Sequence, residues 1–416
     1  MTDRRVTHLL GGSASIAVAM GITNVATYAF TIAAARILGP QAYGAFASLM
    51  ATLLVVGVLQ LGLQATAARR IAAEPEHIAQ IERSILGVTY RAAISLGVLL
   101  LVLAPLLNAI LRLDSLATAA LVSVAAVPMT VMGGQAGILQ GERRWLALAV
   151  VYLLSGVPRL VIGLSLIAWH PTESAAMLGT ALGACAPVVA GWYFLRDVRD
   201  TPEPTEEHRF RPVIREAFHN SHVLLAFFTL SNIDIVIARN VLPAHDAGLY
   251  AGGLILTKAV LFLPQFVVVI AFPSMSTTGE RRRALTWSLG LVSALGAAVT
   301  LAAALVPQLA LVFVGGDQFD EISDHLWVFA VLGTILSMLQ LLVYSVLARQ
   351  SQRAVYLVWA AFLAVLTLGL TADSLSGLIT VVITVDAVLL VVLLVVSLRV
   401  IRPLPDDDVV VPPPTP

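Results

Sequence analysis

The feature that most constrains this chain is a succession of long apolar runs separated by short polar gaps. A helix that crosses a bilayer needs about 20 apolar residues, and in lipid its backbone polar groups must be satisfied internally. We therefore predict an all-α integral membrane protein with about twelve transmembrane helices, over residues 10–35, 44–67, 85–111, 116–139, 145–169, 174–195, 219–238, 248–273, 284–313, 325–347, 354–370 and 375–397.

Composition agrees with this class of protein. Of the 416 residues, 58% are hydrophobic and 12% are charged, whereas a soluble domain keeps roughly 25% charged residues. The first run is much longer than the apolar core of a signal peptide, which is about 7–15 residues. We therefore expect it to be an uncleaved first span.

The arginines provide a test of the number of spans, because short cytoplasmic loops carry an excess of Lys and Arg. We number the polar gaps between spans and count the N-terminal tail as gap zero. Twenty arginines lie in or next to the even-numbered gaps. Only Arg36, Arg112 and Arg239 lie in the odd-numbered gaps. A missed helix would reverse this alternation in every later gap. The pattern predicts twelve spans with both termini in the cytoplasm.

The longest internal polar stretch divides these spans six and six. We predict an N-terminal six-helix bundle over residues 1–200, a cytoplasmic linker over 201–216 and a C-terminal six-helix bundle over 217–402. Residues 403–416 are rich in Asp and Pro, and such a composition favours a disordered tail.

The two halves also resemble one another in sequence. Three pairs of segments match at offsets of about 203–209 residues: 35–40 with 238–243, 42–47 with 246–251, and, more weakly, 139–144 with 347–353. A shift of six helices is even, so both halves have the same orientation in the membrane. The sequence therefore predicts a parallel internal repeat about an axis along the membrane normal.

Loop motifs then relate the chain to a known family. Residues 36–44, Arg-Ile-Leu-Gly-Pro-Gln-Ala-Tyr-Gly, resemble the signature that follows the first helix of O-antigen flippases of polysaccharide biosynthesis. Residues 247–250, 138–141 and 313–316 also resemble that family's loops. The resemblance implies the MATE-like fold of the multidrug/oligosaccharidyl-lipid/polysaccharide exporter superfamily.

The resemblance also implies a function. Such a flippase would carry an undecaprenyl-pyrophosphate-linked oligosaccharide from the cytoplasmic to the outer leaflet of the bacterial inner membrane, driven by an ion gradient. Its partners would be that lipid-linked oligosaccharide, membrane lipids, and a polysaccharide polymerase or glycosyltransferase of the same route. No nucleic-acid partner and no cofactor are expected.

Ionisable residues inside the spans mark the candidate site. Each costs about 2.5–3.5 kcal/mol at bilayer depth, so each should face a cavity or a partner. The ones that we single out are Arg159, Asp234, Lys258 and Asp386. Asp234 and Lys258 are roughly 10 and 15 Å below the outer surface by helical rise. They are either a neutralising ion pair or a switch in which Asp234 and Asp386 couple transport to an ion.

We assign substrate binding to the basic and amide groups. Arg159 has no acidic neighbour along its own helix, and its planar fork suits a phosphate; pairing with Asp386 is the alternative. Arg36 and Arg239 lie near outer helix ends, where they bind the cargo or extend to the interface. The cations outnumber the carboxylates Asp234 and Asp386, because Lys258 adds to the three arginines. This balance favours binding of a pyrophosphate. Asn24 and Asn232 bind sugar or other helices.

Other functions remain as alternatives. A cation-coupled multidrug exporter of the MATE type would favour an acidic cavity, which this balance of charges opposes. A polymerase or ligase would need a large external loop, and the external gaps are short. A scaffold without transport activity would tolerate neutral substitutions at Arg159 and Asp234. The single cysteine, Cys185, excludes a cysteine-based metal centre, and no metal site is expected.

Overall fold

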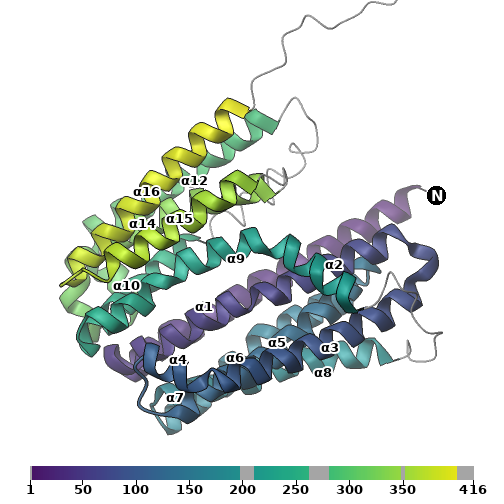
Figure 1. The fold of residues 1–416 in the computed structure, drawn as a ribbon, viewed down its shortest axis with the longest axis horizontal. Helices are drawn as coiled ribbons and strands as arrows, with labels where there is room; N and C mark the ends of the chain where they lie inside the picture. The colour runs from purple at the N-terminus through teal and green to yellow at the C-terminus, as the bar shows by residue number, and fades with distance from the viewer. Residues whose placement is uncertain (1, 197–209, 262–280, 348–351, 401–416) are drawn as a thin grey trace, which may run out of the picture.

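The computed structural model describes residues 2–196, 210–261, 281–347 and 352–400, and every regular element in these ranges is a helix. The ribbon shows two groups of helices, one from each half of the chain, lying side by side (Figure 1). The N-terminal group contains α1 (Thr2–Val56), α2 (Val58–Ala73), η1 (Pro75–His77), α3 (Ile78–Val102), α4 (Ala104–Ile110), α5 (Leu116–Gly141), α6 (Trp145–Trp169), α7 (Glu173–Gly183) and α8 (Cys185–Phe194).

The C-terminal group follows after the described residues resume. It contains α9 (Phe210–Val241), α10 (Ala244–Leu261), α12 (Arg281–Leu305), α13 (Pro307–Val314), η5 (Asp317–His325), α14 (Leu326–Leu347), α15 (Gln352–Gly369) and α16 (Leu375–Val400). The second half of the predicted span 248–273, residues 201–209 of the predicted linker and the predicted tail 403–416 lie outside the described residues. The last residues of that linker, 210–216, are helical and begin α9.

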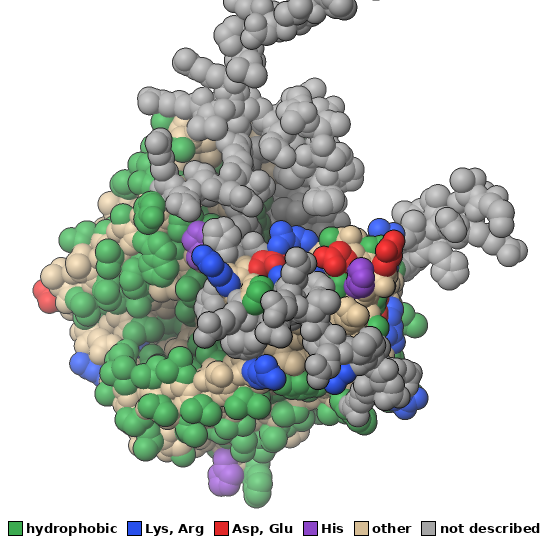
Figure 2. Space-filling model, turned by 45° about the vertical axis from the view of Figure 1, so that its right-hand side comes forward, with side chains coloured by type: hydrophobic (Ala, Val, Ile, Leu, Met, Phe, Trp, Pro, Cys, Tyr) green, Lys and Arg blue, Asp and Glu red, His purple; other side chains and the backbone are tan. Residues whose placement is uncertain are grey.

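Within the described residues, nine helices are long and apolar enough to cross a membrane, and Ala354–Gly369 is apolar but shorter. One of the nine, Ser15–Ala73, has 59 residues and covers two of the predicted spans. The all-α membrane fold is therefore confirmed, and the count of twelve spans stays a prediction. Figure 2 shows hydrophobic side chains over much of the face it presents, with many of the charged side chains right of the centre and others at the left edge and below. Such an extensive exposed apolar surface suits contact with lipid.

Gly39 breaks the long first helix at the end of the first predicted span. Its φ of 70° and ψ of 173° are non-helical, and Gly adopts positive φ without steric cost. Pro40 follows and has no N–H to donate. The motif that suggested family resemblance is therefore a turn between two helical segments of α1.

The repeat-related glycines of the two halves meet at the same end of the molecule. A Cβ placed on Gly44 of α1 would lie 2.9 Å from the Cα of Gly248 on α10. A Cβ on Gly248 would lie 2.0 Å from the carbonyl oxygen of Pro40. Only glycines allow this approach, so α1 and α10 form a closed seam at the end that the arginine pattern places outside.

Helix α9 packs in both halves. Its residues Val213 and Ala217 belong to a buried cluster made otherwise of N-terminal residues, including Leu63 and Ile85. Further along, α9 joins a second buried cluster, made mostly of C-terminal residues together with residues of α1 such as Phe30 and Phe46. Figure 1 shows it running from beside α2 toward α10. The N-terminal turns of α9 are also held by Glu216, which forms ion pairs with Arg69 and Arg70 of α2.

Candidate functional site

A cavity of about 360 Å³ lies between the two halves, and we call it the central cavity. Helices α1 and α6 provide its N-terminal wall, and α9, α10 and α14 provide its C-terminal wall. Its lining residues are Thr27, Tyr28, Phe30, Thr31, Tyr43, Phe46, Ala47, Met50, Ala51, Leu54, Arg159, Phe228, Ser231, Asn232, Ile235, Ala251, Leu254, Ile255, Lys258, Leu261 and Gln340.

Arg159 is the cation of the N-terminal wall. One of its terminal nitrogens donates to Thr27 Oγ1 at 2.6 Å, and its guanidinium carbon lies 6.0 Å from the ring centroid of Phe30. Its Nε is buried and has no hydrogen-bond partner among the described residues. A buried donor without a partner is costly, so Arg159 has unused capacity to bind an anion in the cavity.

Lys258 is the cation of the C-terminal wall. Its Nζ donates to the carbonyl oxygen of Ser231 at 2.7 Å and to Asn232 Oδ1 at 2.9 Å. Asn232 in turn donates to the carbonyl oxygen of Phe228 at 2.8 Å. The side chain of Asn232 is thereby oriented by its own helix so that its oxygen faces the ammonium group.

The buried carboxylates Asp234 and Asp386 are not among the residues that line the cavity. Asp234 accepts from the Tyr250 hydroxyl at 3.1 Å and from the Ile235 amide at 2.9 Å. Asp386 is 1% exposed, and its Oδ1 has no hydrogen-bond partner in the described part of the chain. Both carboxylates interact electrostatically with Lys258, but the structure gives Lys258 amide and carbonyl oxygens, not Asp234, as its direct partners.

The charges on the cavity wall are therefore of one sign. In the part of the chain that the structure describes, its lining includes Arg159 and Lys258 and no Asp or Glu. Aromatic rings from both halves, such as Phe46 and Phe228, contribute to a mostly apolar surface around the two cations. In such surroundings a fixed cation attracts an anion more strongly than it does in water.

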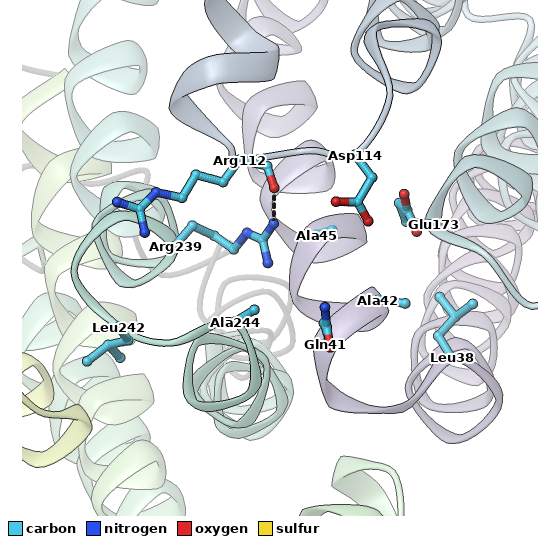
Figure 3. A pocket seen from close by; sticks show the side chains of 10 residues that line it. All are labelled: Leu38, Gln41, Ala42, Ala45, Arg112, Asp114, Glu173, Arg239, Leu242 and Ala244. Carbon is cyan, nitrogen blue, oxygen red and sulfur yellow. Dashed lines mark hydrogen bonds between the residues drawn. The ribbon is translucent and has the colours of Figure 1, made fainter.

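The structure separates the remaining predicted site residues from this cavity. Arg36 and Arg239 are not among its lining residues and lie at the closed end that the arginine pattern places outside. Arg239 lines a second pocket of about 330 Å³ with Arg112, Asp114 and Glu173. Figure 3 shows Arg239 directed at the Arg112 carbonyl while the Arg112 side chain extends away from Asp114. Asn24 is half-buried on α1 and also does not line the central cavity.

The sequence analysis did not identify several polar residues that line the central cavity. Gln340 of α14 is 6% exposed, and its Oε1 has no partner among the described residues. Its Nε2 donates to Tyr344 at 3.0 Å. An uncharged polar residue in an apolar run costs less than a charge, so a search for charges alone passes over it. Tyr28 and Tyr43 gave no signal because tyrosine is common in apolar helices.

Solved structures of membrane transporters have the same fold. An inward-facing multidrug resistance MATE family transporter matches with a TM-score of 0.72 at 15% identity, over 92% of this chain and 94% of that one. The lipid II flippase MurJ in an inward closed conformation matches with a TM-score of 0.69 at 12% identity, over 92% and 87%.

A third structural neighbour is a transporter of the MOP superfamily from Pyrococcus furiosus. Reverse polarity of its binding pocket is reported to suggest a different function for that protein. It matches with a TM-score of 0.55 at 15% identity, over 94% of this chain and 95% of that one. At these identities the similarity establishes the fold, which is that of MATE and MurJ transporters.

A comparison with curated proteins found no match. The family model described as polysaccharide biosynthesis protein matches residues 9–279, more than half of the chain. Its match includes the motifs after the first helix and before the predicted fifth span. The chain therefore belongs to the polysaccharide biosynthesis protein family.

Proposed function

We propose that this protein is a flippase that moves a polyprenyl-pyrophosphate-linked oligosaccharide from the cytoplasmic to the outer leaflet of a bacterial inner membrane. The observation that carries the proposal is the central cavity, whose walls, among the described residues, present two cations and no carboxylate. A pyrophosphate is the part of such a cargo that is most costly to move through lipid. The two halves supply one cation each to the same cavity, Arg159 and Lys258.

The buried carboxylates suit a different task. Asp234 and Asp386 are close enough to Lys258 to interact with it electrostatically, yet neither lines the cavity. Burial of two carboxylates near one ammonium leaves an excess of negative charge, which a proton or a metal cation would neutralise. We therefore propose that Asp234 and Asp386 couple the transport cycle to a cation gradient.

Reconstituted vesicles test the flippase proposal. Purified protein is placed in liposomes with a fluorescent undecaprenyl-pyrophosphate oligosaccharide, an ion gradient is imposed, and the label in the outer leaflet is measured by chemical quenching. We expect the wild-type protein to exchange the label between leaflets. Arg159→Gln should slow exchange by roughly tenfold, because a hydrogen bond to a charged group is lost.

Arg91→Gln is the matched control, since Arg91 is an exposed arginine that does not line the cavity. It should exchange the label at the wild-type rate. Equal rates for Arg159→Gln and wild type would reject the head-group role of Arg159. Failure of the wild-type protein to move the label under sodium and proton gradients would reject the flippase itself.

Multidrug export is the second candidate function. The aromatic lining, including Phe30, Tyr43 and Phe228, could hold an organic cation over ring faces. Arg159 and Lys258 oppose this, since they would repel such a cation. Expression in a host that lacks its own drug pumps separates the two functions, because a drug exporter would raise resistance to cationic dyes and a lipid flippase would not.

A further inference from the structure

Arg36 and Arg239 occupy equivalent places in the two halves, and each reaches across the seam into the opposite half. Arg36, near the outer end of the first span, donates to the carbonyl oxygen of Val312 at 2.8 Å. Arg239, near the outer end of α9, donates from Nε to the carbonyl oxygen of Leu111 at 3.0 Å. A second nitrogen of Arg239 donates to the carbonyl oxygen of Arg112.

The acceptors of these bonds are helix ends. Val312 lies in the last turn of α13, and Leu111 directly follows α4. The last carbonyl groups of a helix have no partner within it and carry a partial negative charge. A guanidinium placed there satisfies those oxygens and interacts favourably with the helix dipole. Each half thus provides one arginine and one helix end, and the arrangement repeats with the two roles exchanged.

Neighbouring amides strengthen both contacts. Asn240, next to Arg239, donates to the carbonyl oxygen of Ile110 at 2.7 Å. On the other side, Gln318 donates to the carbonyl oxygen of Arg36 at 2.9 Å. Together with the close approach of Gly44 and Gly248, these bonds close the outer seam between the halves.

We propose that Arg36 and Arg239 are paired outer latches, which hold the outer ends of the halves together while the central cavity faces the cytoplasm. Opening the cavity outward breaks both contacts and exposes donors and acceptors to water. Because water then replaces the lost partners, the net stabilisation is modest and the latches are reversible. Each contact joins protein groups of the two halves, so the proposal does not depend on the identity of what is transported.

The two latches differ in strength. Arg239 is 6% exposed and donates to two carbonyl oxygens, whereas Arg36 is exposed and donates to one. Burial strengthens a charge-assisted hydrogen bond, and exposure to salt and water weakens it. Arg239 is therefore the dominant latch, and its loss should release the outer seam more than the loss of Arg36.

Distances between spin labels across the outer seam test the proposal. The labels are attached at His170→Cys and Asp324→Cys in a Cys185→Ser background, in the full-length protein without cargo. These positions are exposed and lie at the outer ends of opposite halves. We expect Arg239→Gln to raise the ratio of long to short distances by roughly tenfold, Arg36→Gln to raise it less, and the double variant to raise it most.

Arg112→Gln is the control, because it removes an outer positive charge but keeps the carbonyl group that Arg239 binds. It should leave the distances unchanged. Wild-type distances in both latch variants, or an equal change in Arg112→Gln, would overturn the proposal. If Arg239→Gln does not yield folded protein, Asn240→Ala carries the same test, since it removes one bond of the same latch and no charge.

Discussion

At the scale of single residues, the two cations of the central cavity are held in different ways. Arg159 keeps a buried Nε without a partner in the described structure, so it is free to bind a ligand. Lys258 is engaged by Ser231 and Asn232 and lies near two buried carboxylates. We infer that Arg159 serves mainly in binding, whereas Lys258 also balances the charge of Asp234 and Asp386.

This difference predicts opposite profiles for two neutral substitutions. Lys258→Met should lower the stability by roughly 2 kcal/mol or more, because it leaves buried carboxylates without their cation. Arg159→Met should affect stability less and transport more. Thermal unfolding in detergent measures the first effect. Adding Asp234→Asn to Lys258→Met should restore much of the lost stability, and a double variant as unstable as the single one would contradict the charge-balance role.

The proposed coupling role of the carboxylates gives a second prediction. Asp386→Asn should abolish the acceleration of transport by a cation gradient, because a neutral amide no longer needs a cation for neutralisation. The rate of label exchange in vesicles is compared with and without a sodium or proton gradient. Asp373→Asn, at an exposed position after α15, should respond to the gradient like the wild type. An undiminished response in Asp386→Asn would rule out Asp386 as a coupling residue.

The sequence predicted the cavity cations because a charge in an apolar run is conspicuous. Arg159, Lys258 and Asn232 do line one cavity, as a shared site requires. The sequence could not distinguish these from Arg239, because depth along a helix does not reveal which way a side chain turns. It also could not show that Lys258 bonds to Ser231 and Asn232 of α9 rather than to Asp234 of the same helix, since that depends on helix rotation.

At the scale of helices, the crossing of α1 and α10 depends on the absence of side chains at Gly44 and Gly248. Gly248→Ala would place its Cβ 2.0 Å from the Pro40 carbonyl oxygen, so the helices must separate. We expect a loss of about 1–3 kcal/mol, as for overpacked cores. Thermal unfolding measures it.

Gly290→Ala provides the comparison for this substitution. Gly290 is an exposed glycine of α12 with nothing within 4 Å of its added Cβ. Since alanine favours helix more than glycine does, this variant should be as stable as the wild type or slightly more stable. Equal stability of the Gly248 and Gly290 variants would show that the seam is not tightly packed.

Most helices could be located from apolar runs alone, and the break after the first span could be expected from Gly39 and Pro40. The start of α9 could not. Residues 210–216 are polar enough to suggest a linker, yet they are helical because Val213 and Ala217 pack against the N-terminal half. A short amphipathic extension of an apolar helix is hard to tell from a loop when its partner surface is unknown.

At the scale of the whole molecule, ion pairs fix this extension to the opposite half. Glu216 accepts from Arg70 at 2.8 and 3.0 Å and also pairs with Arg69. Glu216→Gln should destabilise the protein by up to about 1 kcal/mol, since the pair is partly exposed. Amide hydrogen exchange over residues 210–217 should become faster. Glu76→Gln, at an exposed position in η1, should leave that exchange unchanged. Unchanged exchange in Glu216→Gln as well would show that the ion pairs do not stabilise this segment.

A helix that is embedded in both bundles limits how those bundles can reorient. Near Ala217, α9 is buried against the N-terminal half, and near Leu230 it joins a cluster made mostly of C-terminal residues. The halves can therefore reorient only if this helix flexes or one of these contacts changes. A transition between inward and outward states would then require α9 to bend between these two buried segments. The stiffness of the few helical turns between them would set the rate of that transition.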